Sequence, residues 1–503
     1  MSIYKDADSK SEVKSQQSDQ LANTAVRGGG AIAASRILGQ ITQVATTMVL
    51  ARLLLPDDFG VVAMVVAVVS ILHIFNDLGF VDATIQTEKL SDEQSSNLFW
   101  LNVIVNVSFF AILSLISVPI ARFYNDKRVV LLMIVISTEL IFLAFGNQHF
   151  ALLKREMVFG KVALIILIAM VLSNILAIIS AILGAGYWAL VVRQLSMPAI
   201  RAVCAWIVFR WRPKKIFKLK NTLNLVWFGL KTSASLVISH LSMSLPRIML
   251  GRTVGTRGLA FYDRSYSLMM LPVSQMSVSF HHVAISTLRR SRDNPTEFQK
   301  FYLRAISTLS FVAMPLGAIL SVLSEDVINI FLGPGWEQAV PLLSIFSLTI
   351  GLRVVYMTNS WLHVSLGKAK RRIIWEVATF SVIIIGVIIA LPFGLNKVAW
   401  VISIAPAVLV FPGIAYAGKP IGLSFFQVFK ELWRCIISAG GSGFILYTIM
   451  NIIPEWTAII RLISGSLIGL ILYLTIIIIL HGGFQPIHDL FKVLLKLRKR
   501  KLH

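Results

Sequence analysis

Residues 26–87 read VRGGGAIAASRILGQITQVATTMVLARLLLPDDFGVVAMVVAVVSILHIFNDLGFVDATIQT, and the rest of the chain is organised around this stretch. It consists of two long apolar segments joined by a short turn at residues 55–59. A related pattern returns 200 positions later, over residues 226–287, as VWFGLKTSASLVISHLSMSLPRIMLGRTVGTRGLAFYDRSYSLMMLPVSQMSVSFHHVAIST. Placed without a gap, the copies share Gly29 and Gly229, Ala34 and Ala234, Ser35 and Ser235, Leu50 and Leu250, Arg52 and Arg252, Phe80 and Phe280, Ile85 and Ile285, and Thr87 and Thr287. We interpret this as an internal duplication, a common feature of transporters.

The composition indicates an all-α polytopic membrane protein. Of the 503 residues, 56% are hydrophobic and only 14% are charged, and the mean hydropathy is +0.78. A soluble protein carries about a quarter charged residues. Apolar runs recur along the whole chain, and about 20 such residues cross a hydrocarbon core of about 30 Å. The two cysteines, Cys204 and Cys435, fall in or beside apolar segments and indicate neither a disulfide nor a metal site.

We predict about 14 transmembrane helices with short connections and no inserted soluble domain. The predicted spans cover residues 25–51, 59–81, 97–118, 129–151, 160–183, 187–209, 225–250, 259–283, 303–323, 338–362, 373–391, 396–416, 434–453 and 459–481.

The net charge of +23 is distributed unevenly between alternate connections. One set, which includes both terminal tails, holds 32 Lys and Arg, whereas the other set holds 8. Positive charge stays in the cytosol during membrane insertion, so we expect both termini to be cytosolic and the number of spans to be even. Anionic lipid head groups suffice as partners for charge spread over many short loops. Nucleic-acid binding would need one basic face beside aromatic platforms and is not expected.

The number of predicted spans determines the relative orientation of the two repeats. Six predicted spans separate the start of the first copy from the start of the second, so the halves are parallel repeats related by an axis along the membrane normal, with a cavity expected between them. The predicted parts are a disordered cytosolic tail (1–24), an N-terminal six-helix bundle (25–209), a basic cytosolic linker (210–224), a C-terminal six-helix bundle (225–416), two additional transmembrane helices (417–485) and a basic cytosolic tail (486–503).

Several motifs resemble a known family. GGGAIAASRILGQITQVATTMVLARLLLPDDFGVVAM and FNDLGFVDATIQ resemble the start of the polysaccharide transporter family of the MOP superfamily, the Wzx-type flippases, in particular the branch of the colanic acid exporter and lipopolysaccharide biosynthesis proteins. RIMLGRTVGTRGLAFYDRSYSLMMLP and FLGPGWEQAVPLLSIFSL resemble two further segments of that family. The resemblance covers roughly residues 25–450.

This resemblance implies a fold shared with MATE-type multidrug exporters and lipid II flippases, in which two six-helix bundles enclose a cavity that opens alternately to each side. It also implies the movement of an undecaprenyl-diphosphate-linked oligosaccharide across the bacterial inner membrane for surface polysaccharide assembly. Polysaccharide polymerase and chain-length machinery are then candidate partners, and no cofactor is expected.

Ionisable residues inside predicted spans are rare, and each is a candidate functional residue. Arg36 and Lys231 lie at similar depths of the first and seventh spans, and Arg353 lies deep in the tenth. If they face one cavity, the three form a cationic site for a diphosphate, for which arginine offers forked donors. For each of the three, packing or snorkelling near the interface is the alternative interpretation.

Five further residues are candidates for coupling or gating. Asp77 and Glu139 could each pair with a basic residue or carry a coupling proton, and Asp77 could instead cap a helix end before Gly79. Arg247 and the pair Asp263 and Arg264 could seal the outer side of the cavity.

Three other classes of protein are alternatives to a flippase. A cation-coupled MATE-type exporter of small molecules would share the architecture, but a basic cavity would repel cationic drugs. A membrane polymerase or ligase usually carries a large extracytoplasmic loop, which this chain lacks, and no catalytic constellation is visible. A scaffold would not need Arg353 inside a span.

Overall fold

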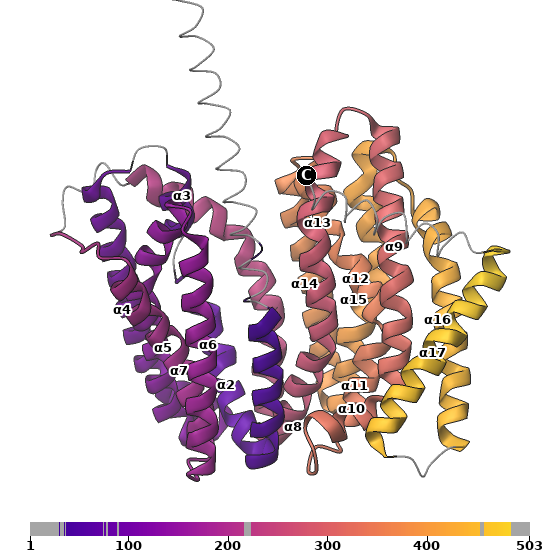
Figure 1. Cartoon of the computed structure of the whole chain (residues 1–503), viewed down its shortest axis with the longest axis horizontal. Coiled ribbons are helices and arrows are strands. Elements are labelled where there is room, and N and C mark those ends of the chain that lie inside the picture. Colours follow the sequence, from indigo (N-terminus) through magenta and orange to yellow (C-terminus); the bar gives the residue numbers. More distant parts are fainter. Residues whose placement is uncertain are drawn as a thin grey trace, which may run out of the picture. The chain divides into compact units, whose positions relative to one another are not determined.

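The computed structural model describes residues 30, 35, 37–73, 75–76, 79–87, 90–215, 223–452 and 457–483, with the backbone alone at 223–237, 239, 277–279 and 281–283. Throughout this part of the chain the regular elements are helices (Figure 1). The chain divides into two compact units, residues 1–244 (unit 1) and 245–503 (unit 2).

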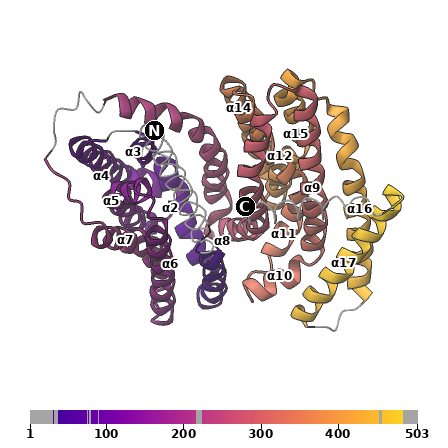
Figure 2. The same cartoon turned by 45° about the horizontal axis from the view of Figure 1, so that its top comes forward.

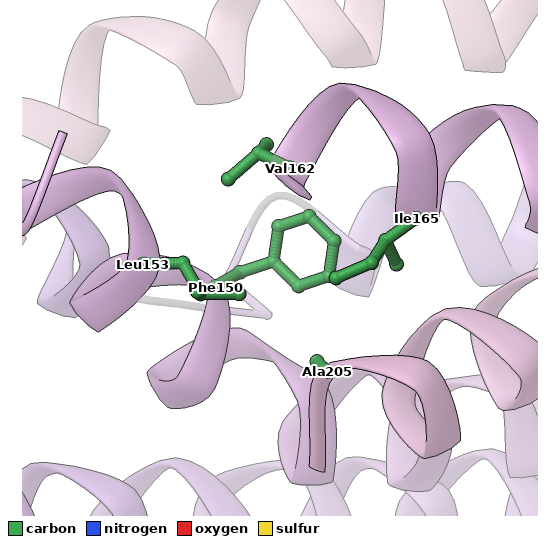
Figure 3. Packing of buried hydrophobic residues seen from close by; sticks show 5 residues of the cluster. All are labelled: Phe150, Leu153, Val162, Ile165 and Ala205. Carbon is green, nitrogen blue, oxygen red and sulfur yellow. The ribbon is translucent and has the colours of Figure 1, made fainter. Parts of the chain in front are cut away.

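In unit 1, residues 37–53 are helical. The helices that follow are α2 (Pro56–His73), α3 (Phe80–Gln86), α4 (Asp92–Tyr124), α5 (Arg128–Arg155), α6 (Phe159–Ile182) and α7 (Trp188–Val208). Phe150 of α5 lies at the centre of a hydrophobic cluster with Leu153 of the same helix, Val162 and Ile165 of α6, and Ala205 of α7 (Figure 3). Each of these residues is at most 2% exposed, so the cluster ties three long helices into one bundle.

A long element, α8 (Leu223–Arg290), crosses the border between the units. Unit 2 continues with α9 (Pro295–Val322), α10 (Ser324–Phe331), α11 (Ala339–Leu348), α12 (Ile350–Met357), α13 (Asn359–Ser365), α14 (Ala369–Ala390), η2 (Leu391–Phe393), α15 (Leu395–Gly418), η3 (Lys419–Ile421), α16 (Phe425–Ile452) and α17 (Ala458–His481). The last two helices lie side by side at one edge of unit 2, where both pack against α9 (Figures 1 and 2).

The described helices make this a multi-pass membrane protein. Ten of them are long and apolar enough to cross a membrane, and the bent pair Ala339–Leu348 and Ile350–Ser365 raises the number to eleven if it forms one span. The predicted spans at 25–51, 225–250 and 259–283 include residues or side chains outside the described part of the chain. The predicted number of 14 therefore stays a prediction.

The second predicted span, residues 59–81, is wrong as one continuous helix. Helix α2 ends at His73 and α3 begins at Phe80, after Gly79 in a left-handed conformation with φ 74°. Carbonyl groups freed at such a break need donors, because lipid offers none. The side-chain amides of Asn102 and Asn106 both donate to the backbone oxygen of Asn76, at 2.9 and 2.7 Å. Helix α4 therefore supplies the donors for this carbonyl group in the break.

The tenth predicted span, residues 338–362, is also broken rather than straight. Helices α11 and α12 meet at Thr349 with a bend of 53°. Close packing against α9 accompanies this bend. A Cβ added to Gly317 of α9 would lie 2.7 Å from the carbonyl oxygen of Ser347, and one added to Gly351 would overlap the sulfur of Met314.

Matched positions of the two sequence copies have similar local structure. In the first copy the helix is interrupted at residues 54–55. In the second copy α8 is interrupted at Gly255, which has φ 72° and ψ −174°. Leu50 and Leu250 are both fully buried, and the arginines two positions later are both exposed. The ungapped match therefore aligns the two interruptions.

The chain after α7 is held against unit 1. The indole Nε1 of Trp100 donates to the carbonyl oxygen of Lys214 at 2.8 Å. The backbone N–H of Lys214 donates to Ser96 Oγ at 3.1 Å, and its ammonium group lies 3.1 Å from a carboxylate oxygen of Asp92. The first part of the predicted linker, residues 210–215, is therefore attached to α4, while residues 216–222 lie outside the description.

Candidate functional site

Charged and aromatic side chains from both parts of α8 and from α12 meet inside unit 2, beside a backbone carbonyl of α15. Arg247 precedes the interruption at Gly255, while Asp263, Arg264 and Tyr266 follow it. Arg353 belongs to α12. We call these five residues the arginine cluster.

Asp263 is the anionic centre of the arginine cluster. One of its carboxylate oxygens lies 3.0 Å from Nε of Arg247, and the other is paired with the guanidinium of Arg264. The residue is only 7% exposed. A buried carboxylate requires such partners, because leaving water costs several kcal/mol per ion. Asp263 thus joins the two parts of α8 across the interruption.

Arg353 is held differently, by neutral acceptors. Its Nη1 donates to the hydroxyl of Tyr266 at 2.8 Å, and its Nη2 donates to the carbonyl oxygen of Ile402 in α15 at 2.9 Å. Among the described residues, no carboxylate lies within ion-pair distance of Arg353, and its Nε–H has no hydrogen-bond partner. Three arginines in the arginine cluster therefore face one aspartate, which leaves an excess of positive charge.

The ring of Tyr266 lies within cation–π distance of two of these arginines. The guanidinium carbon of Arg353 is 5.4 Å from the ring centroid and that of Arg247 is 5.9 Å from it. Tyr262 stacks on the ring at 5.9 Å, and Phe346 of α11 contacts it edge-on at 5.5 Å. These neighbours fix the orientation of the ring.

The two family-like segments of unit 2 pack against each other beside the arginine cluster. Trp336, from FLGPGWEQAVPLLSIFSL, is fully buried and meets the ring of Phe261 edge-on at 5.8 Å. Ser265 Oγ donates to the carbonyl oxygen of Ala339 at 2.8 Å. In the connection before α11, the N–H of Gly335 donates to Glu337 and lowers the pKa of that carboxyl. These contacts anchor the second part of α8 to α11.

Unit 1 contains a second polar group, around Glu139 of α5. One carboxylate oxygen of Glu139 lies 3.2 Å from Nε2 of His73, where α2 ends. The other accepts a hydrogen bond of 2.7 Å from the amide of Gln194 in α7. Next to Gln194, Nε of Arg193 donates to Asn174 Oδ1 at 3.0 Å. The carboxylate is therefore buried among partners that can stabilise its charge.

The structure places five of the eight candidate residues that the sequence indicated. Arg247, Asp263, Arg264 and Arg353 lie together in the arginine cluster, and Glu139 has its partners in unit 1. The remaining three candidates are not placed: Arg36 and Asp77 lie outside the described residues, and Lys231 belongs to α8 with its side chain outside the description.

Sequence reasoning missed several residues that the structure brings forward. His73, Arg193 and Arg201 all lie inside predicted spans, so the rule that flagged Glu139 would have flagged them too. The guanidinium of Arg201 lies over the ring of Phe150, 4.1 Å from its centroid. Tyr266 carried no comparable signal, since a tyrosine in an apolar helix is ordinary. Within the described part of the chain, no group of three His, Cys, Asp or Glu is placed to hold a metal ion.

A family model described as "Polysaccharide biosynthesis protein" matches residues 49–341. Among curated proteins, the chain is 25% identical over 374 residues to the teichuronic acid biosynthesis protein TuaB of Bacillus subtilis (strain 168), which covers 74% of this chain and 77% of that protein. It is 21% identical over 398 residues to the lipopolysaccharide biosynthesis protein WzxC of Escherichia coli (strain K12), which covers 76% and 79%.

Solved structures share the fold. The inward closed conformation of the lipid II flippase MurJ matches with a TM-score of 0.71 and 16% identity, over 90% of this chain and 98% of that one. An inward-facing multidrug resistance MATE family transporter of the MOP superfamily matches with a TM-score of 0.62 and 17% identity, over 76% and 94%. The fold is therefore that of flippases and transporters.

Proposed function

This chain belongs to the polysaccharide biosynthesis protein family, since the family model matches more than half of its residues, and we propose that it is a flippase. Its substrate is an undecaprenyl-diphosphate-linked oligosaccharide, a repeat unit of a surface polysaccharide, and it moves this substrate across the bacterial inner membrane by alternating access. The prediction of the family from sequence motifs is confirmed.

The observation that carries the proposal is the excess of positive charge in the arginine cluster. Among the described residues, both hydrogen-bond acceptors of Arg353 are neutral, so neither compensates its positive charge. Ionisable groups inside membrane helices are expensive and mark functional sites by default. A diphosphate carries about two negative charges, and guanidinium groups bind phosphate oxygens in pairs. An anionic substrate that must leave water is therefore the ligand that suits this cluster best.

We assign roles to the candidate residues within this mechanism. Arg353 binds the diphosphate together with Arg36 and Lys231. Arg247, Asp263 and Arg264 act as a gate, since their ion pairs join the two parts of α8. Asp77 and Glu139 are the candidates for coupling transport to protons.

The proposed architecture has 14 spans, arranged as two six-helix bundles in parallel repeat with two additional C-terminal helices. The matching interruptions at residues 54–55 and at Gly255 support the duplication. Lys and Arg are concentrated in one set of connections, which supports the proposal that both the N-terminus and the C-terminus are cytosolic. Polysaccharide polymerase and chain-length proteins are the proposed partners.

A MATE-type exporter of small cationic molecules is the alternative, because its fold is shared. The charge of the arginine cluster favours the flippase, since three arginines beside one aspartate repel a cationic substrate. A cationic dye and an anionic lipid-linked sugar therefore separate the two functions when both are offered to the same protein.

Proteoliposomes containing the full chain test the function. We expect them to translocate a fluorescent undecaprenyl-diphosphate-linked saccharide. The variant Arg353→Gln should reduce the rate by about 10- to 100-fold, because a hydrogen bond to a charged group contributes about 1.5–3 kcal/mol. Arg252→Gln removes the same charge from an exposed position of unit 2 and should transport normally.

Two results would contradict this assignment. Equal rates for Arg353→Gln and the unmodified protein would remove Arg353 from the binding site. Transport of the cationic dye without transport of the saccharide would replace the flippase by the alternative function.

A further inference from the structure

Tyr266 contacts Arg353, the proposed substrate-binding arginine, through both its hydroxyl group and its aromatic ring. Its hydroxyl accepts a hydrogen bond of 2.8 Å from Nη1 of Arg353. Its ring face lies 5.4 Å from the guanidinium carbon of the same residue. The only other hydrogen bond found for this guanidinium among the described residues goes to the carbonyl oxygen of Ile402. Two neutral anchors, one from α8 and one from α15, therefore set the direction of the charge.

The ring is itself held in place. Tyr262 stacks on it one helical turn earlier, with the rings inclined by only 11°, and Phe346 meets it at 90°. Both neighbours are buried. A phenol that is fixed in this way presents its oxygen at one position, so the guanidinium loses little freedom when it binds a ligand.

We propose that Tyr266 is a positioning residue for the substrate diphosphate, which acts by holding the guanidinium of Arg353 in its binding orientation. This rests on the proposed function, because it assumes that Arg353 contacts the diphosphate. Tyr266 leaves the positive charge of Arg353 intact, whereas a carboxylate in its place would orient the guanidinium and neutralise it. A tyrosine at this position is therefore what an anion-binding arginine requires.

A double-mutant cycle tests the proposal, with undecaprenyl diphosphate as the probe and the Kd measured on the detergent-solubilised full chain. Tyr266→Phe keeps the ring and removes the hydroxyl, and we expect a Kd about three- to tenfold higher, as for the cost of ordering one flexible side chain when the ligand binds. Arg353→Gln should raise the Kd at least tenfold. The double variant should bind as weakly as Arg353→Gln alone, because residues that act through each other are not additive.

Tyr262→Phe is the matched control, since it removes a hydroxyl from the neighbouring ring of the same helix. We expect it to leave the Kd unchanged. An unchanged Kd for Tyr266→Phe, or a loss that multiplies with that of Arg353→Gln, would overturn the positioning role and leave the flippase assignment intact. Unweakened binding by Arg353→Gln would overturn both the role of Arg353 and the inference built on it.

Discussion

At the scale of single residues, the balance of charge around Asp263 governs the site. Two arginines share this one buried carboxylate, and a third arginine beside them is held by neutral groups. An apolar environment tolerates such charges only when each has partners, since an unpaired buried ion costs several kcal/mol. The arginine cluster combines two ion-paired arginines with one arginine that is held by neutral groups, and we propose that this third arginine binds the anionic substrate.

Removing the negative charge of Asp263 should destabilise the protein. Asp263→Asn leaves Arg247 and Arg264 without their shared counter-ion, and breaking a buried ion pair costs about 3–5 kcal/mol. The measurement is unfolding in mixed detergent micelles, monitored by circular dichroism. The control Asp293→Asn changes an exposed aspartate in the turn before α9 and should stay within about 0.5 kcal/mol of the unmodified protein. Equal stability of the two variants would show that the paired charges contribute nothing.

At the scale of elements, interruptions of helices are the recurring feature. Helical structure is interrupted at residues 54–55, between His73 and Phe80, at Gly255 and at Thr349. The breaks before Phe80 and at Thr349 lie inside predicted spans, so they free backbone groups that must find partners within the protein. At Asn76 the amides of α4 are these partners, and at Gly255 the ion pairs of Asp263 join the two sides.

Gly255 should be sensitive to substitution even though open space surrounds it. With φ 72° and ψ −174° it occupies a region that is essentially restricted to glycine, so Gly255→Ala should cost about 1–3 kcal/mol even though no atom lies within 4 Å of the added carbon. Gly440→Ala in α16 also meets open space, but in helical backbone, and should stabilise by about 0.5–1 kcal/mol. Thermal unfolding of the two variants should therefore shift in opposite directions. An unchanged or higher unfolding temperature for Gly255→Ala would refute the strained conformation at Gly255.

At the scale of the whole molecule, the driving force for export follows from the charge of the substrate. Moving one elementary charge across 100 mV is worth about 2.3 kcal/mol. A head group with about two negative charges therefore gains about 4–5 kcal/mol when it leaves a cell whose interior is negative. A proton gradient could add to this through Glu139, which lies between His73 and Gln194.

Flux measured in proteoliposomes separates the two contributions. We expect export of the labelled saccharide under an imposed membrane potential without a pH gradient, and a further increase when a pH gradient is added. Glu139→Gln should abolish the increase and keep the potential-driven flux, whereas Glu93→Gln, at an exposed position of α4, should change neither. A flux that does not respond to the potential would exclude electrophoretic export. An increase that survives Glu139→Gln would exclude Glu139 as the coupling group.

The helical membrane class, the family and the candidate charges were accessible from the linear chain. Hydropathy adds up along consecutive residues, so apolar runs identify membrane helices before any packing is known. Charges such as Arg353 and Glu139 are conspicuous for the same reason, because a charged residue within an apolar run is rare. The motifs around residues 28–86 carried enough identity to indicate the family.

The partners of those charges were not accessible in this way. Arg353 meets Tyr266, 87 positions earlier in the chain, and Glu139 meets His73, 66 positions earlier. The ends of α2 and α11 depend on donors from α4 and on close packing by α9. Such contacts arise when helices distant in the sequence cross, and no local property of either segment specifies the crossing. Hydropathy along the chain therefore predicts which segments are apolar enough to cross a membrane, whereas packing determines where helices break, which side chains meet and how much charge is left unpaired.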